Sequence, residues 1–217
     1  YYTCRWSRVN HAPVTELRRW DDGKLVATLA EADDSALRAT KWPLPEPFVA
    51  KDRDGKFDIH GIVCLPPDFD PAKKYPVFQI LYGGPHAPKV ANRWSGQGVQ
   101  SMLMLQLVAQ QGAIGWVADN RTASGKGAVS AWGAHKRLGE SELRDLEDAT
   151  AWLKAQPWVD GSRFALFGWS YGGYMVAYAL THSTSFSAGI SGAPVTDWRD
   201  YDSIYTERLM LMPQNNP

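Results

Sequence analysis

The sequence predicts an α/β fold with a mainly parallel sheet, and two observations carry this prediction. From residue 75 onward, short apolar runs of strand length alternate with longer runs of helical periodicity. Strands and helices that alternate in this way form βαβ units, whose strands lie parallel. In addition, residues 164–176 place a Gly-x-Ser-x-Gly turn between an apolar run and a helix-like run. A strand, a sharp turn and a helix in that order agree with the predicted architecture.

Composition limits the classes of partner. The chain has 217 residues, 44% of them hydrophobic, with ten Trp, which is ample for a packed core. Lys and Arg together number 23, as do Asp and Glu, so the formal net charge is zero. A neutral chain without a basic stripe argues against nucleic acid or an anionic membrane as its main partner. The two cysteines, Cys4 and Cys64, lack metal-ligand spacing, and no metal or cofactor is expected.

The first 45 residues are predicted to form short strands followed by a connector. Strands are expected at 1–9, 14–20 and 25–29, and one helical turn at 33–38. Asp21-Asp22-Gly23 separates two of these strands, which is a hairpin signal. Nine of the 14 prolines then fall between Pro43 and Pro88, beginning with an extended connector over 42–47. We therefore predict a domain boundary near residue 45.

The elements of the second domain, residues 46–217, follow in order. Strands are predicted at 48–51, 57–65, 75–82, 114–119, 164–167 and 186–191, and helices at 101–110, 142–156 and 171–181. The first two strands should form a hairpin, because Asp54-Gly55 lies between them. The run at 75–82 is mostly apolar, which suits a strand buried on both faces.

Ser170 is the candidate nucleophile. It is the centre of Gly-Trp-Ser-Tyr-Gly at 168–172, between the predicted strand and helix. In the α/β-hydrolase fold this context holds the serine in a strained turn, with its hydroxyl above the sheet. Larger residues at Gly168 and Gly172 are expected to collide with the neighbouring helix and strand. The alternative is a tight structural turn with an ordinary serine.

Two candidate groups could stabilise an oxyanion beside this serine. Tyr82-Gly83-Gly84-Pro85 follows a buried strand, and in α/β-hydrolases the loop after such a strand supplies one donor. The backbone N–H after the nucleophile, here that of Tyr171, supplies the other. The Tyr82 hydroxyl is the candidate first donor, while a turn with a packed tyrosine is an equal alternative on spacing alone.

Two further groups of side chains allow a structural and a functional interpretation. Trp198, Tyr201 and Tyr205 lie at i, i+3 and i+7, which predicts one face of a helix. That face is either core or the wall of an apolar pocket suited to a flat ring such as proline. The acidic residues at the start of the helix predicted at 142–156 are expected to form a solvated face; they are Glu140, Glu142, Asp145, Glu147 and Asp148.

The histidines leave the serine without a base. In this fold the order along the chain is Ser, then Asp or Glu, then His. After Ser170 the sole histidine is His182, one residue past the predicted helix. No Asp or Glu lies between the two in the sequence, so the required order is not met. The other histidines, His11, His60, His86 and His135, precede the serine. We expect the triad Asp and His to lie outside this chain, and the chain alone to be inactive.

Several blocks of sequence resemble the dipeptidyl peptidase IV branch of the prolyl oligopeptidase family of serine peptidases. These blocks are Gly-Trp-Ser-Tyr-Gly-Gly-Tyr at 168–174, Gly-Ala-Pro-Val-Thr-Asp-Trp at 192–198, Tyr-Asp-Ser-Ile-Tyr-Thr-Glu-Arg at 201–208, Tyr-Gly-Gly-Pro at 82–85 and Lys-Arg-Leu-Gly at 136–139. The resemblance implies the end of a β-propeller in residues 1–45 and an incomplete α/β-hydrolase domain in residues 46–217. It implies that Ser170 is the nucleophile and that Tyr82 and the Tyr171 N–H form the oxyanion hole.

The same resemblance implies a substrate. Val195, Trp198, Tyr201 and Tyr205 would line a proline pocket, and the enzyme would release N-terminal Xaa-Pro or Xaa-Ala dipeptides through an acyl-enzyme. Such enzymes are commonly homodimers and are periplasmic, extracellular or membrane-anchored. The propeller glutamates that hold the substrate amine are expected outside this chain. Two alternatives stay open: an acylaminoacyl or oligopeptidyl peptidase or esterase of the same fold, and a non-catalytic binding domain.

Overall fold

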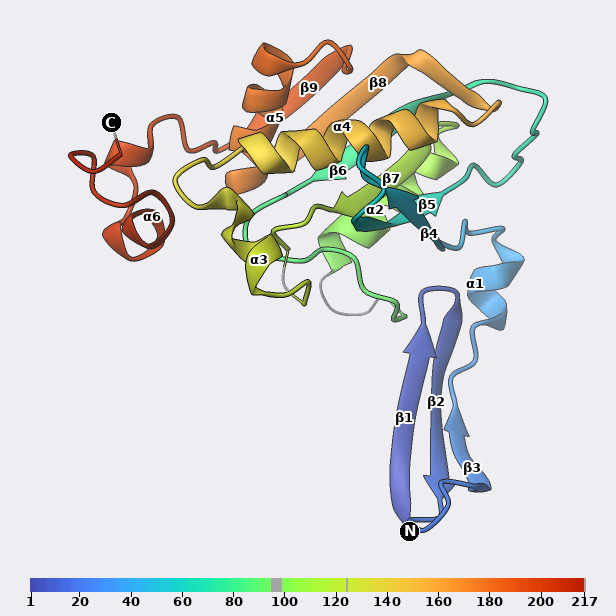
Figure 1. Ribbon diagram of the computed structural model, residues 1–217. Helices are drawn as coiled ribbons and strands as arrows, with labels where there is room; N and C mark the ends of the chain where they lie inside the picture. The colour runs from blue at the N-terminus through green and yellow to red at the C-terminus, as the bar shows by residue number, and fades with distance from the viewer. Residues whose placement is uncertain (95–98, 124, 217) are drawn as a thin grey trace.

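The computed structural model describes residues 1–94, 99–123 and 125–216, and these form two sheets (Figure 1). The N-terminal sheet is antiparallel, with β1 (Tyr2–Arg8), β2 (His11–Arg18) and β3 (Leu25–Glu31) in that order. Gly23 takes a φ of 68° in the β2–β3 turn, as the predicted hairpin requires. A short helix, α1 (Ser35–Ala39), follows where one helical turn was expected.

The second sheet has six strands in the order β4-β5-β7-β6-β8-β9. Their bounds are β4 (Glu46–Lys51), β5 (Asp58–Cys64), β6 (Tyr75–Leu81), β7 (Ile114–Asp119), β8 (Val159–Trp169) and β9 (Ala188–Gly192). The four strands from β7 to β9 pair in parallel, whereas β4–β5 and β5–β7 pair antiparallel. The prediction of a mainly parallel sheet is therefore confirmed, with an antiparallel hairpin at one edge.

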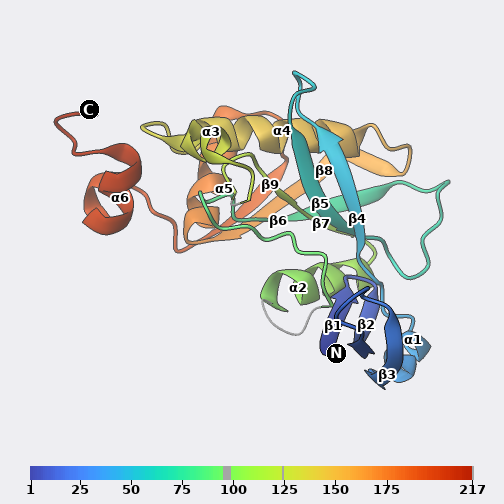
Figure 2. The ribbon, with the colours of Figure 1, turned by 60° about the horizontal axis from the view of Figure 1, so that its bottom comes forward.

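Helices cover both faces of this sheet (Figure 2). On one face lies α2 (Val99–Gln110), and on the other lie α4 (Glu140–Lys154) and α5 (Tyr171–His182). Trp116 and Val117 show the division, because these neighbours on β7 point to opposite faces and belong to separate apolar clusters. Trp116 packs with the α4 and α5 side chains, and Val117 packs with Leu105 and Ala109 of α2.

The C-terminal aromatic segment differs from the prediction. The single helix expected across Trp198, Tyr201 and Tyr205 is wrong, since a 3₁₀ turn (Trp198–Asp200) and a separate helix, α6 (Ser203–Met210), replace it. The break has a local cause. Asp202 is extended, with φ −67° and ψ 147°, and its side chain accepts a hydrogen bond from the Tyr205 N–H, so it begins a new helix.

The remaining short elements connect the sheet to the loops. A one-turn helix, α3 (Ala128–Ala131), and a 3₁₀ turn (Trp132–Ala134) lead from β7 into α4. Among the residues that the structure describes, none of the helices has both the length and the apolar character needed to cross a bilayer.

Candidate active site

Ser170 lies between the end of β8 and the first residue of α5. Its φ of 59° and ψ of −120° are strained for a residue with a side chain. The Ser170 N–H donates to the Gly192 carbonyl at 2.9 Å, and the Tyr174 N–H donates to the Ser170 carbonyl at 3.0 Å. Hydrogen bonds to β9 and to α5 therefore hold the strained turn in place.

The glycines around Ser170 permit close contact between backbones. A Cβ on Gly168 would lie 2.2 Å from the Gly172 carbonyl oxygen, and one on Gly172 would lie 2.2 Å from the Leu81 oxygen. A Cβ on Gly173 would lie 2.4 Å from the Gly192 oxygen. The expected collisions at Gly168 and Gly172 are therefore confirmed, and they involve backbone atoms, which cannot rotate away.

Tyr82 lies beside this turn because of the pairing between β6 and β8. Leu81 is the register partner of Gly168, so the residues that follow both strands leave the sheet at one edge. The ring centroids of Tyr82 and Tyr171 are 6.1 Å apart. A Cβ on Gly84 would lie 2.8 Å from Tyr82 Cε1 and 3.2 Å from Tyr171 Cγ, so this glycine leaves room for both rings.

The protonation state of Tyr82 suits a hydrogen-bond donor. Burial, with a smaller contribution from Tyr201, raises the pKa of the Tyr82 hydroxyl above its ordinary value. The hydroxyl therefore keeps its proton at neutral pH. The Lys89 Nζ atom lies 4.1 Å from the centre of the same ring, in a cation–π contact.

The predicted aromatic residues come together although they do not share one helix. The Tyr171 ring centroid is 5.6 Å from that of Trp198 and 6.4 Å from that of Tyr205. Trp198 and Tyr205 are stacked at 6.1 Å, and Tyr201 meets Tyr205 edge to face at 5.8 Å. Val195 is half-buried in the loop between β9 and Trp198. Tyr171 therefore connects the serine to this aromatic cluster.

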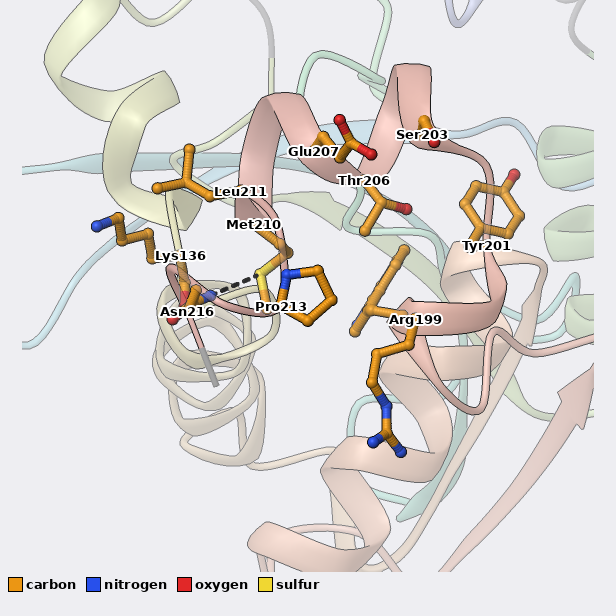
Figure 3. Close-up of a pocket in the computed structure, with 11 residues that line it drawn as sticks. Lys136, Arg199, Tyr201, Ser203, Thr206, Glu207, Met210, Leu211, Pro213 and Asn216 are labelled. Atoms are coloured by element: carbon orange, nitrogen blue, oxygen red, sulfur yellow. Dashed lines mark hydrogen bonds between the residues drawn. The ribbon is translucent and has the colours of Figure 1, made fainter.

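A cavity of about 560 Å³ adjoins part of the cluster (Figure 3). Trp198 and Tyr201 line it together with α6 and with Lys136, which precedes α4. Thr206 and Met210 point toward it from α6. Ser170 is not among its lining residues.

The acidic start of α4 is only partly the predicted solvated face. Glu140 is exposed, but Glu142 and Asp145 are each 1% exposed, which contradicts the prediction for these two. Their side chains have buried partners: Glu142 accepts from the Tyr171 hydroxyl at 2.8 Å, and Asp145 pairs with Arg121. Glu142 lies four residues before Leu146 and seven before Ala149, so helical periodicity already places it on the buried face.

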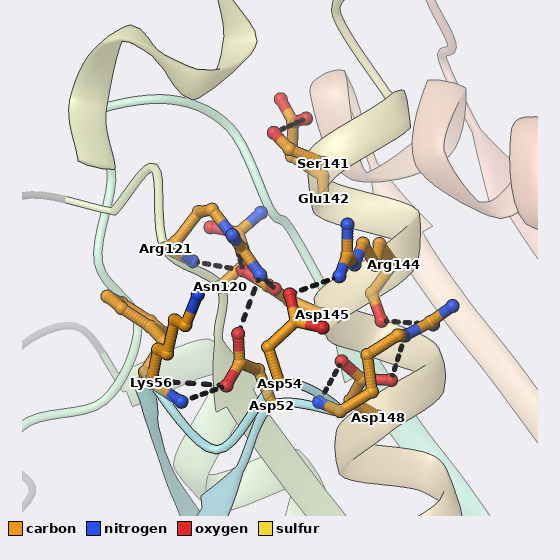
Figure 4. A network of polar contacts seen from close by, with 12 residues as sticks. Asp52, Asp54, Lys56, Asn120, Arg121, Ser141, Glu142, Arg144, Asp145 and Asp148 are labelled. Atoms are coloured by element: carbon orange, nitrogen blue, oxygen red, sulfur yellow. Dashed lines mark hydrogen bonds and ion pairs between the residues drawn. The ribbon is translucent and has the colours of Figure 1, made fainter. Parts of the chain in front are cut away.

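A polar network connects α4 to the segment that directly follows β7 (Figure 4). Asp145 accepts from the Arg121 backbone N–H at 2.6 Å and from Arg121 Nε at 2.9 Å. The neighbouring Asn120 donates from Nδ2 to the Gly83 carbonyl at 2.8 Å. Sequence reasoning did not single out Asn120 for the site, although a polar residue directly after a parallel strand is a signal for one.

His182 lies far from the serine. It is the last residue of α5, and Ser170 directly precedes the first, so a helix of 12 residues separates them by about 18 Å. The His182 ring stacks on Tyr178 at 4.0 Å, and its Nδ1 lies 3.0 Å from the Tyr178 carbonyl. Within residues 1–94, 99–123 and 125–216, no hydrogen bond joins a histidine ring to Ser170. His182 is therefore not placed to act as its base.

Comparisons with known proteins show which family this chain resembles over most of its length. The model of the prolyl oligopeptidase family matches residues 99–217. The probable dipeptidyl-aminopeptidase B of Ajellomyces dermatitidis is 46% identical over 214 residues, which are 97% of this chain and 22% of that protein. The crystal structure of Porphyromonas gingivalis dipeptidyl peptidase 4 is 31% identical with a TM-score of 0.81, over 98% of this chain and 30% of that one.

A further solved structure, from Bacteroides ovatus, is 35% identical with a TM-score of 0.87 and has the same coverage of both chains. This chain thus spans less than a third of the length of these relatives. The comparisons confirm the α/β-hydrolase fold expected from the sequence. The family match extends over more than half of the chain and includes Ser170 and the aromatic cluster, so the chain belongs to the prolyl oligopeptidase family.

Proposed function

We propose that the protein is a serine exopeptidase that releases N-terminal dipeptides whose second residue is Pro or Ala, with Ser170 as its nucleophile. One observation supports this most directly: the strained Ser170 turn lies beside the Tyr82 ring and is followed by Tyr171, whose ring joins the aromatic cluster. Relatives over nearly the whole chain carry the name dipeptidyl peptidase or dipeptidyl-aminopeptidase.

In the proposed reaction, the Ser170 Oγ attacks the carbonyl carbon of the second residue of the substrate, and the bond from that carbon to the nitrogen of the third residue breaks. The serine proton passes to a base and then to the leaving amine, and water hydrolyses the resulting ester. The Tyr82 hydroxyl and the Tyr171 N–H stabilise the oxyanion, and one such donor contributes about 3 kcal/mol to the transition state. The base and its orienting acid belong, in this proposal, to parts of the protein beyond these 217 residues.

The aromatic cluster supplies the preference for proline in this proposal. A pyrrolidine ring is flat and apolar, and it packs well against aromatic faces. Val195, Trp198, Tyr201 and Tyr205 would surround it together with Tyr171. An alanine side chain is small enough for the same space, whereas longer side chains would meet the rings.

Substitution of the serine in the full-length protein tests the proposal. We expect Ser170→Ala to abolish turnover of an Xaa-Pro-p-nitroanilide, and Ser183→Ala, a serine near the far end of α5, to leave turnover unchanged. Turnover retained in Ser170→Ala would reject the assignment. An N-terminally blocked peptide and a short ester complete the panel, because faster turnover of either would favour the acylaminoacyl or esterase alternative.

We also propose that residues 1–45 are the end of a β-propeller and that residues 46–217 belong to the catalytic domain. The antiparallel three-stranded sheet and the proline-rich connector support this division. The full-length protein would act as a homodimer, as the family resemblance implies. Analytical ultracentrifugation of the full-length protein tests this, and a monomer at micromolar concentration would contradict it.

A further inference from the structure

Glu142 is a buried acid that the mechanism above does not use. It lies in the first turn of α4, is 1% exposed, and accepts one hydroxyl on each carboxylate oxygen. The Tyr171 hydroxyl donates to Oε1 at 2.8 Å, and the Ser141 hydroxyl donates to Oε2 at 2.9 Å. Among the described residues, no lysine or arginine forms an ion pair with it. Burying an acid without a cation costs free energy, and the position of Glu142 in the first turn of α4 offsets only part of that cost.

The partner of Glu142 is central to the site. Tyr171 directly follows Ser170, begins α5, and is 3% exposed. Its ring contacts Tyr82 on one side and Trp198 and Tyr205 on the other. The serine turn holds the backbone of Tyr171, and the hydrogen bond to Glu142 holds its hydroxyl on α4. Both ends of the residue are therefore fixed.

We propose that Glu142 is a positioning residue that holds Tyr171, and thereby sets the oxyanion N–H and the inner wall of the proline pocket. This inference rests on the proposed function. Without the hydrogen bond, the Tyr171 ring is no longer held to α4, and it can turn away from Tyr82 and Trp198. Because α5 begins at Tyr171, the same movement shifts its N–H relative to Ser170.

Four substitutions test the role of Glu142, and each one removes a different group from the contact or from its surroundings. Glu142→Ala removes the acceptor, whereas Glu142→Gln keeps an acceptor oxygen in the same place and removes the charge. Tyr171→Phe keeps the ring and removes the donor. Ser141→Ala is the matched control, because it removes the other hydrogen bond to the same carboxylate without touching Tyr171.

In the full-length protein, we expect Glu142→Ala to lower kcat for an Xaa-Pro amide by about 10- to 100-fold, since a small misplacement of a transition-state contact has an effect of that size. KM should change less, because the oxyanion contact forms mainly in the transition state. Glu142→Gln should stay within about threefold of the original kcat, and Ser141→Ala within about twofold, because both leave the Tyr171 contact in place. Tyr171→Phe should match Glu142→Ala, and the double variant should be no worse than either one.

Three results would overturn the inference: an unchanged kcat in Glu142→Ala, a Gln variant as impaired as the Ala variant, or additive losses in the double variant. If Glu142→Ala does not fold, the comparison of Tyr171→Phe with Ser141→Ala still decides, since a kcat equal in both variants contradicts the proposal. The rate at which a fluorophosphonate modifies Ser170 separates this inference from the proposed function. That rate needs no dipeptide substrate, so it tests Glu142 even if the unsubstituted protein cleaves no Xaa-Pro amide.

Discussion

The Asn120 side chain joins the end of β7 to the loop after β6 through its hydrogen bond to the Gly83 carbonyl, at 2.8 Å. Asn120 is 6% exposed, and its Oδ1 accepts from the Thr122 hydroxyl at 3.2 Å. Because Tyr82 is the residue before Gly83, this contact restrains the backbone next to the candidate oxyanion donor.

Removing this hydrogen bond should destabilise the protein and displace Tyr82. We expect Asn120→Ala to lower the free energy of unfolding by about 1–3 kcal/mol, because the Gly83 carbonyl loses its partner. Asn120→Asp keeps the shape without the donor and should lose as much. Denaturant unfolding and kcat of the full-length protein check both variants, and a stable, fully active Asn120→Asp protein would contradict the role given to this amide.

The close approach of α5 to β6 predicts a strong effect of one methyl group. We expect Gly172→Ala to lower the free energy of unfolding by about 2–3 kcal/mol, since its Cβ would lie 2.2 Å from the Leu81 oxygen. Gly161→Ala is the control, because its nearest neighbour would be 3.6 Å away, and it should change stability by less than about 0.5 kcal/mol. Equal stabilities in a thermal unfolding experiment would refute the packing argument.

Arg121 should matter much more than an exposed arginine. Its guanidinium pairs with Asp145 and with Asp52, whose side chains are 0% and 2% exposed. Arg121→Ala leaves both carboxylates buried without a cation, and we expect a loss of about 3–5 kcal/mol in unfolding free energy. Arg199→Ala breaks the exposed pair with Asp197 and should cost at most about 1 kcal/mol. A similar small loss in both variants would show that the buried network contributes little.

The two cysteines should differ in reactivity. Burial raises the pKa of the Cys64 thiol to about 12, and the side chain is 0% exposed. At pH 8 roughly one thiol in ten thousand is then the reactive thiolate. We expect iodoacetamide to modify the half-buried Cys4 in the native protein and Cys64 only in denaturant, as peptide mass spectrometry would show. Modification of Cys64 as fast as Cys4 in the native protein would contradict the burial of Cys64 at the end of β5.

The order of elements and the serine turn could be predicted because local sequence determines them. The Gly-x-Ser-x-Gly turn requires glycine at fixed positions, and the structure shows the backbone contacts responsible at Gly168 and Gly172. The hairpin at Asp54-Gly55 follows from the same local chemistry, since Gly55 takes a φ of 68°.

What could not be predicted depends on neighbours distant in the sequence. A run of acids at a helix start is usually solvated, and only the packing of α4 against Tyr171 and Arg121 buries Glu142 and Asp145. The aromatic periodicity predicted one helix, but the side chain of Asp202 caps a new one. Spacing alone did not decide whether Tyr82 lay near the serine. The pairing of Leu81 with Gly168 places Tyr82 near the serine, and this pairing connects residues that are 87 positions apart in the sequence.

That pairing has a consequence for how the family can diversify. Main-chain hydrogen bonds between β6 and β8 set where Ser170 and Tyr82 lie relative to each other, so their separation does not depend on which side chains surround them. The rings of Trp198, Tyr201 and Tyr205 come from segments outside the sheet. In the function proposed above, substitutions there can change which residue is accepted without changing the β6–β8 pairing that places Ser170 beside Tyr82. Under that proposal, the substrate preference can evolve while the relative position of Ser170 and Tyr82 is kept.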